Sequence, residues 1–187
     1  PSEENRTIDA DIMDNLSRRQ VGDIASVGFL WWDVNPFDDP AVGGGRLLGE
    51  ACHFVDLLRH LSGSSIDDLQ LFSSADLKPC PDTFSLQLRF ADGSIGTVHY
   101  LANGSKAFPK ERLEVFADGK VLQLDNFRKL RAWGVPGFRT RRLFSQDKGQ
   151  EACCSAFLKA IETGGPSPIP VGEIFEVQRW LLRAVNR

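Results

Sequence analysis

The sequence predicts an α+β domain in which helices pack on one face of a largely antiparallel open sheet. Three observations predict this class. The segment 46–62 repeats its apolar residues with the period of a helix, whereas the stretches between 67 and 127 alternate with the period of a strand. Two further helical segments close the chain. Regular alternation of strands and helices, which would predict a parallel sheet, is missing.

The chain begins with a polar stretch, 1–22, in which Ile8, Ile12 and Leu16 are spaced by four residues. This spacing suits a weakly amphipathic helix or a lead-in to the domain. A chain of 187 residues suits one domain and can bury about two thirds of the surface of the unfolded chain. We therefore expect a lead-in or linker over 1–22 and one α+β domain over 23–187.

The first strand is predicted within 23–34, where the run is β-prone and ends in the turn-forming "NPFDDP". A helix is predicted over 46–62, and Gly63 is a suitable stop. Its apolar residues share one broad face: Leu47, Ala51, Phe54, Val55, Leu58 and Leu61. Its polar residues gather on the neighbouring flank: Arg46, His53, Asp56 and His60.

The strands that follow are predicted to form antiparallel hairpins. Their alternation is broken by an Asp-Gly pair at 92–93 and by another at 118–119, and such pairs favour tight turns. A further strand is expected over 137–144. The chain closes with helices over 147–165 and 171–185.

Composition excludes several classes of protein. The hydrophobic fraction is 42% and the formal net charge is −3, which is ordinary for a globular protein and gives no overall reason to bind nucleic acid. No apolar run approaches the about 20 residues of a membrane span, and we expect no signal peptide. The four cysteines lack metal-binding spacing, so we expect free thiols in a reducing cytoplasm.

A basic stretch from Arg128 to Lys148 interleaves arginines with aromatic residues, as nucleic-acid surfaces do. The same alternation also suits a sheet with one solvated face, in which basic residues guard an edge. We favour the second interpretation and predict no nucleic-acid partner.

The glycines before the helix raise the question of phosphate binding. Gly43, Gly45 and Gly49 form a loose G-x-G-x-x-x-G, but a dinucleotide fingerprint must directly follow a buried strand. Here "NPFDDPAV" intervenes. We therefore expect the glycines to let the loop bend tightly and bring its backbone close to a ligand or another segment.

His53 is the candidate for acid–base chemistry. Glu50 lies one turn before it and Asp56 one turn after it, and a neighbouring carboxylate orients an imidazole and tunes its pKa. A histidine hydrogen-bonded at the edge of the core is the alternative. A metal site with His60 is disfavoured because that residue lies two turns, about 10 Å, from His53. No metal is predicted.

The segment 43–63, "GGGRLLGEACHFVDLLRHLSG", resembles a motif in the C-terminal domain of the glucose-fructose oxidoreductase, inositol dehydrogenase and MocA (Gfo/Idh/MocA) family. The motif of these NAD(P)-dependent sugar oxidoreductases reads G-G-x-L-x-D-x-G-x-H-x-x-D. Five positions match: Gly44, Gly45, Leu47, His53 and Asp56. The segment 146–170 also resembles the family's closing helix and loop, so the similarity covers about 23–187.

The resemblance implies that 23–187 is a substrate-binding and oligomerisation domain, with His53 as the catalytic residue in a proton relay. It implies a substrate-binding role for Glu50, Asp56, Gly44, Gly45 and Arg46. The cofactor, NAD or NADP, and the main catalytic lysine would belong to an N-terminal Rossmann domain. No strand–GxGxxG–helix unit occurs in this sequence, and the start at Pro1 agrees with truncation. We expect no cofactor in this chain, which would be inactive alone.

The motif departs from the family at one position. Gly49 stands where the family has aspartate, and Glu50 points about 100° away from that position on a helix. A second hypothesis follows, in which the domain is a non-catalytic scaffold with a decayed pocket. Under the first, the partners are a sugar-like small molecule, the missing Rossmann domain and a second copy bound through the sheet.

Overall fold

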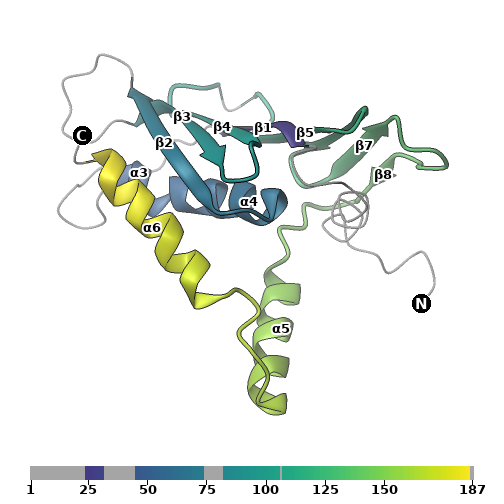
Figure 1. Ribbon diagram of the computed structural model, residues 1–187. Helices are drawn as coiled ribbons and strands as arrows, with labels where there is room; N and C mark the ends of the chain where they lie inside the picture. The colour runs from purple at the N-terminus through teal and green to yellow at the C-terminus, as the bar shows by residue number, and fades with distance from the viewer. Residues whose placement is uncertain (1–23, 32–44, 74–81, 106, 186–187) are drawn as a thin grey trace.

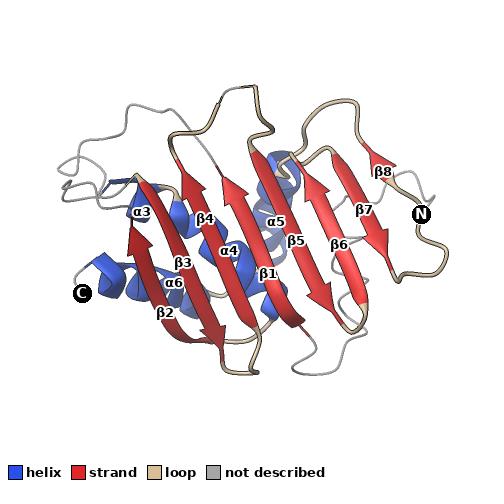
Figure 2. Ribbon diagram, turned by 90° about the horizontal axis from the view of Figure 1, so that it is seen from above, coloured by secondary structure: helices blue, strands red, loops and turns tan. Residues whose placement is uncertain are grey.

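The computed structural model describes residues 24–31, 45–73, 82–105 and 107–185. Their strands form one eight-stranded sheet in the order β2-β3-β4-β1-β5-β6-β7-β8 (Figures 1 and 2). The strands are β1 (Ile24–Trp31), β2 (Ile66–Ser73), β3 (Thr83–Phe90), β4 (Ile95–Leu101), β5 (Glu111–Ala117), β6 (Lys120–Asp125), β7 (Lys129–Trp133) and β8 (Arg141–Arg142). The stretch expected to form a lead-in, 1–22, lies outside the described residues.

The sheet is largely antiparallel, as predicted. Among the described strands only β1 and β4 pair in parallel, and β1 pairs antiparallel with β5 on its other side. Strand β1 is therefore inserted between the two hairpins β3–β4 and β5–β6. That position depends on long-range pairing, because nothing in the local sequence of β1 specifies its neighbours.

Both predicted Asp-Gly hairpins form. In the β3–β4 turn Gly93 has φ +87°, and the Asp92 carboxylate accepts hydrogen bonds from the backbone and hydroxyl of Ser94. In the β5–β6 turn Asp118 and Gly119 have φ +47° and +69°. These left-handed conformations favour glycine and aspartate, which explains why the dipeptide marks the turns.

Helices cover one face of the sheet (Figure 2). They are α3 (Gly45–Gly49), α4 (Ala51–Ser62) and α6 (Val171–Val185). The single helix predicted over 46–62 is divided at Glu50, and α4 ends at Gly63, whose φ is +65°. Helix α4 buries the predicted apolar face against the sheet, including Phe54, Val55 and Leu58.

Helix α6 packs on α4 and β2 with Val177, Leu181 and Ala184. Arg59 of α4 fixes this contact, because its guanidinium lies 3.2 Å from Glu176 and 3.5 Å from Glu173. The other carboxylate oxygen of Glu176 accepts a hydrogen bond from the Ile66 backbone N–H at the start of β2. One carboxylate therefore joins three elements.

The predicted helix at 147–165 is confirmed as α5 (Gln150–Thr163), but it projects away from the sheet (Figure 1). The strand expected over 137–144 is reduced to β8, and β7 was not predicted. Gly137, where that strand was expected to begin, lies in a turn with φ +76°, and strand pairing starts only at Arg141. Within the described ranges, no helix is both long and apolar enough to cross a bilayer.

Candidate functional site

The candidate site is the outer flank of α4, on the side opposite the sheet. His53 and His60 are exposed there, and Asp56 between them is half-buried. The helical period places the three side chains in one sector, whereas Phe54 and Leu58 point into the core. The imidazole of His53 is therefore accessible and is not sealed in apolar packing.

Charges from two helices meet at Asp56. Burial raises the pKa of its carboxyl, His60 and His53 lower it, and Glu173 on α6 raises it further. Glu173 is the residue that sequence reasoning missed, because 117 positions separate it from Asp56. The role of Glu173 becomes visible only in the folded structure, where α6 packs on α4 and Glu173 pairs with Arg59.

Glu50 and Cys52 border the flank at the start of α4. Glu50 is half-buried and occupies the N-cap position, where it makes no side-chain capping hydrogen bond. Burial raises the pKa of the Cys52 thiol, and the charge of Glu50 acts in the same direction. Cys52 is therefore a thiol rather than a reactive thiolate at neutral pH.

Arg46 lies apart from this flank, although the sequence placed it there. It belongs to α3, is 6% exposed, and donates a hydrogen bond of 3.1 Å from Nη1 to the hydroxyl of Tyr100. Tyr100 on β4 is fully buried and stacks on Phe84 with 5.0 Å between ring centroids. The division of the helix at Glu50 causes the difference, because it breaks the angular register between Arg46 and His53.

Gly45 begins α3 with φ +73°, a conformation that favours glycine. Gly44 lies outside the described residues. Within the described residues no helix leads directly from one strand to an adjacent parallel strand, because β2 and β3 lie between β1 and β4 in the sequence, so no dinucleotide-binding β–helix–β unit is seen there. The same part of the chain contains no group of three or more His, Cys, Asp or Glu residues suited to a metal ion.

The basic stretch contributes to the open face of the sheet, where its charges find partners on neighbouring strands. Arg131 on β7 lies 3.3 Å from Asp125 and donates a hydrogen bond of 2.9 Å to Gln123. Arg112 on β5 also pairs with Asp125, at 2.8 Å. These contacts form a cross-strand polar network, which is the arrangement expected of a solvated sheet face.

Comparison with known families gives the class of this fold. The model of the GFO/IDH/MocA C-terminal domain matches residues 14–122, which is more than half of the chain. The chain therefore belongs to the GFO/IDH/MocA C-terminal domain family. No curated protein sequence matches the chain.

Solved structures show the same fold. UDP-N-acetylglucosamine 3-dehydrogenase GnnA from Acidithiobacillus ferrooxidans aligns with a TM-score of 0.72 and 15% identity, over 93% of this chain and 56% of that one. The dehydrogenase MviM from Clostridium difficile aligns with a TM-score of 0.71 and 17% identity, over 94% of this chain and 57% of that one. An oxidoreductase from Agrobacterium radiobacter, in complex with NAD+, L-tartaric acid and magnesium, aligns with a TM-score of 0.71 and 13% identity. The alignment covers 95% of this chain and 59% of that one. The chain thus spans between half and two thirds of the length of these relatives.

Proposed function

We propose that this chain is the substrate-binding and oligomerisation domain of an NAD(P)-dependent oxidoreductase that acts on a hydroxyl of a sugar or nucleotide sugar. The observation that carries the proposal is the accessible His53, one turn from the half-buried Asp56, in a domain of this family. The similar structures include a nucleotide-sugar dehydrogenase and an oxidoreductase that binds NAD+, which supports the same class of reaction.

In this function His53 binds the substrate hydroxyl and accepts its proton through a ring nitrogen as the alcohol is oxidised. Asp56, one turn away on the same flank, is close enough for its carboxylate and the imidazole of His53 to interact electrostatically. NAD or NADP, held by another domain, supplies the hydride acceptor.

We assign the remaining substrate contacts to Glu50, Asp56, Gly44 and Gly45. Glu50 borders the His53 flank. Arg46, which was expected to be a further contact, is buried away from this flank and instead ties α3 to β4 through Tyr100. The described cysteines, Cys52, Cys153 and Cys154, are free thiols, which supports a reducing compartment such as the cytoplasm.

The test is His53→Ala in the full polypeptide that the gene encodes, assayed for turnover with a panel of sugars and nucleotide sugars. Loss of a proton relay should lower turnover by about 10²- to 10⁴-fold. His60→Ala is the matched control, because it removes an exposed imidazole from the same flank two turns away. Wild-type turnover in the His53 variant would remove the assignment.

A second function is supported by Gly49, which replaces the motif's aspartate. In this alternative the domain is a non-catalytic scaffold that assembles through the sheet. Neither histidine variant would then affect any turnover, and sugars would leave the NMR signals of the His53 flank unchanged. Sedimentation would still report an oligomer.

A further inference from the structure

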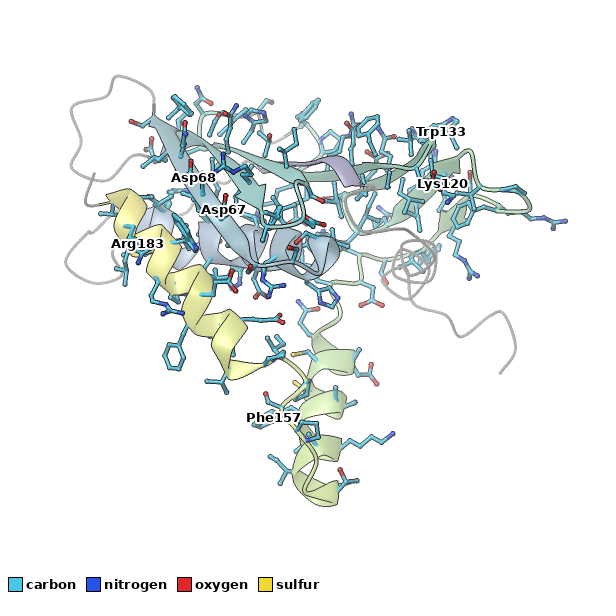
Figure 3. The ribbon with its side chains drawn as sticks, viewed as in Figure 1. Asp67, Asp68, Lys120, Trp133, Phe157 and Arg183 are labelled. Atoms are coloured by element: carbon cyan, nitrogen blue, oxygen red, sulfur yellow. The ribbon has the colours of Figure 1, made fainter. Side chains whose placement is uncertain are left out.

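Helix α5 is amphipathic, yet nothing covers it in the described structure. None of its 14 residues is buried, and Phe157, Leu158 and Ile161 are 57%, 57% and 62% exposed. At the helical period these three share one sector with Cys153 and Cys154. We call these five residues the α5 stripe. Figure 3 shows Phe157 on α5, well away from the sheet.

The root of α5 is fixed to the body of the domain. Lys148 lies 2.6 Å from the carboxylate of Glu111, which is 1% exposed. The Asp147 backbone N–H donates to the carbonyl of Phe127, and the Asp147 carboxylate accepts from the N–H of Gly149, the N-cap of α5. The helix is thus held in a defined position although its sides are free.

The start of α6 presents more apolar surface. Three apolar side chains in its first turns are exposed: Val171 (56%), Ile174 (44%) and Phe175 (61%). Helix α6 follows α5 in the chain, and a short loop connects the two helices. Monomeric proteins seldom expose contiguous apolar surface without a binding role. The α5 stripe and these three residues together therefore suit a macromolecular partner.

The first turns of α6 also touch the candidate site. Glu173 forms an ion pair with Arg59 of α4 and acts on the charge of Asp56. A partner seated on this surface would therefore lie beside the His53 flank. A second copy of the chain has another candidate surface, the open face of the sheet, which faces away from these helices (Figure 1).

The similar structures indicate the size of the partner. The chain covers 56%, 57% and 59% of three of them, so 44%, 43% and 41% of each lies outside the matched region. That share suits one further domain. We propose that the α5 stripe and the first turns of α6 form the docking surface for a dinucleotide-binding domain of the same enzyme. This inference rests on the proposed function.

The exposed thiols of Cys153 and Cys154 report on this contact. In the experiment, a maleimide alkylates these thiols in the 187-residue chain and in the full polypeptide that the gene encodes. Peptide mass spectrometry measures the rate of alkylation at each cysteine. Both should react readily in the shorter chain. In the full polypeptide a docked domain should slow the reaction by at least about tenfold.

Phe157→Asp should abolish this protection in the full polypeptide. Ala152→Asp is the matched control, because it adds the same charge to the side of α5 opposite the stripe and should leave the protection intact. Both side chains are exposed, so neither variant should unfold the 187-residue chain, which circular dichroism checks. A benzophenone maleimide on the thiols should cross-link to peptides outside the 187 residues.

Titration with NADH, followed by fluorescence, separates the two proposals. If the full polypeptide binds NADH but its thiols react as fast as in the shorter chain, the docking surface is wrong and the proposed function stands. If it does not bind NADH, the proposed function fails and the docking proposal fails with it. Protection already present in the 187-residue chain, or cross-links between two copies of it, would overturn the docking proposal alone.

Discussion

Asp56 links the candidate chemistry to the stability of the domain at the scale of a residue. Burial raises the pKa of its carboxyl above the ordinary value of 3.8, in spite of the opposing charges of His60, His53 and Arg59. The folded state therefore binds a proton more tightly than the unfolded state does. Stability should fall as pH rises through the interval between the ordinary and the raised pKa, and remain lower above it.

Asp56→Asn should remove this pH dependence, because the amide does not ionise. At pH 7 we expect the variant to melt about 1–3 °C above the wild type, since a half-buried carboxylate keeps part of its hydration. The difference should shrink as the pH falls and disappear well below the ordinary pKa of 3.8, where the carboxyl is protonated in both states. Calorimetry from pH 3 to 7 measures it. A lower melting temperature at pH 7 would mean that the attraction of Arg59 and His60 outweighs burial.

The residue scale also shows where prediction from the sequence stops. The helical period correctly predicted one shared flank for His53, Asp56 and His60. Their spacing of i, i+3 and i+7 is a local relation within one helix, so it can be inferred from the sequence. Arg46 was misplaced, because a break at Glu50 changed the register. Glu173 was missed, because its contact with the flank depends on how α6 packs.

Among the elements, α4 is positioned by its close approach to β4. A Cβ added at Gly96 would lie 3.0 Å from Cδ1 of Leu58 and 3.2 Å from Cε2 of Phe90. Both neighbours are buried, so neither can move without disturbing the core. The glycine therefore lets the helix that carries His53 lie against the sheet.

Gly96→Ala should destabilise the domain by about 1–3 kcal/mol, because it overpacks this contact. Gly172→Ala is the matched control. It lies in the first turn of α6 with nothing within 4 Å of an added Cβ, and alanine there should stabilise by up to about 1 kcal/mol. Urea unfolding of the two variants gives the comparison. Equal effects of the two substitutions would contradict a steric role for Gly96.

The elements that the sequence predicts well are those with local causes. The Asp-Gly turns form hairpins, and glycines end α4 and α5. The insertion of β1 between β4 and β5 has no local signal, because it depends on pairing across the sheet. The amphipathic pattern of α5 predicts a covered face, and the described structure leaves that face open.

At the scale of the whole molecule, the sheet separates two surfaces of different character. The helix side carries the His53 flank and the α5 stripe. The open face carries a polar network around Asp125 and, beside it, an apolar row across three strands. In that row Phe116 pairs with Val121, and Val121 with Trp133. Phe116 and Trp133 are 42% and 50% exposed, and Figure 3 places Trp133 on this face.

Trp133→Asp should weaken the self-association that we propose for the open face. Tryptophan is a frequent interface hot spot worth at least about 2 kcal/mol, so the dissociation constant should rise about 30-fold or more. Because Trp133 is half exposed, the variant should keep its fold and melt near the wild-type temperature. Ser155→Asp, with the same new side chain on α5, should leave association unchanged. Sedimentation velocity over a range of concentrations measures both variants against the 20.8 kDa monomer. A wild-type chain that stays monomeric throughout would exclude assembly through the sheet, and with it the scaffold alternative.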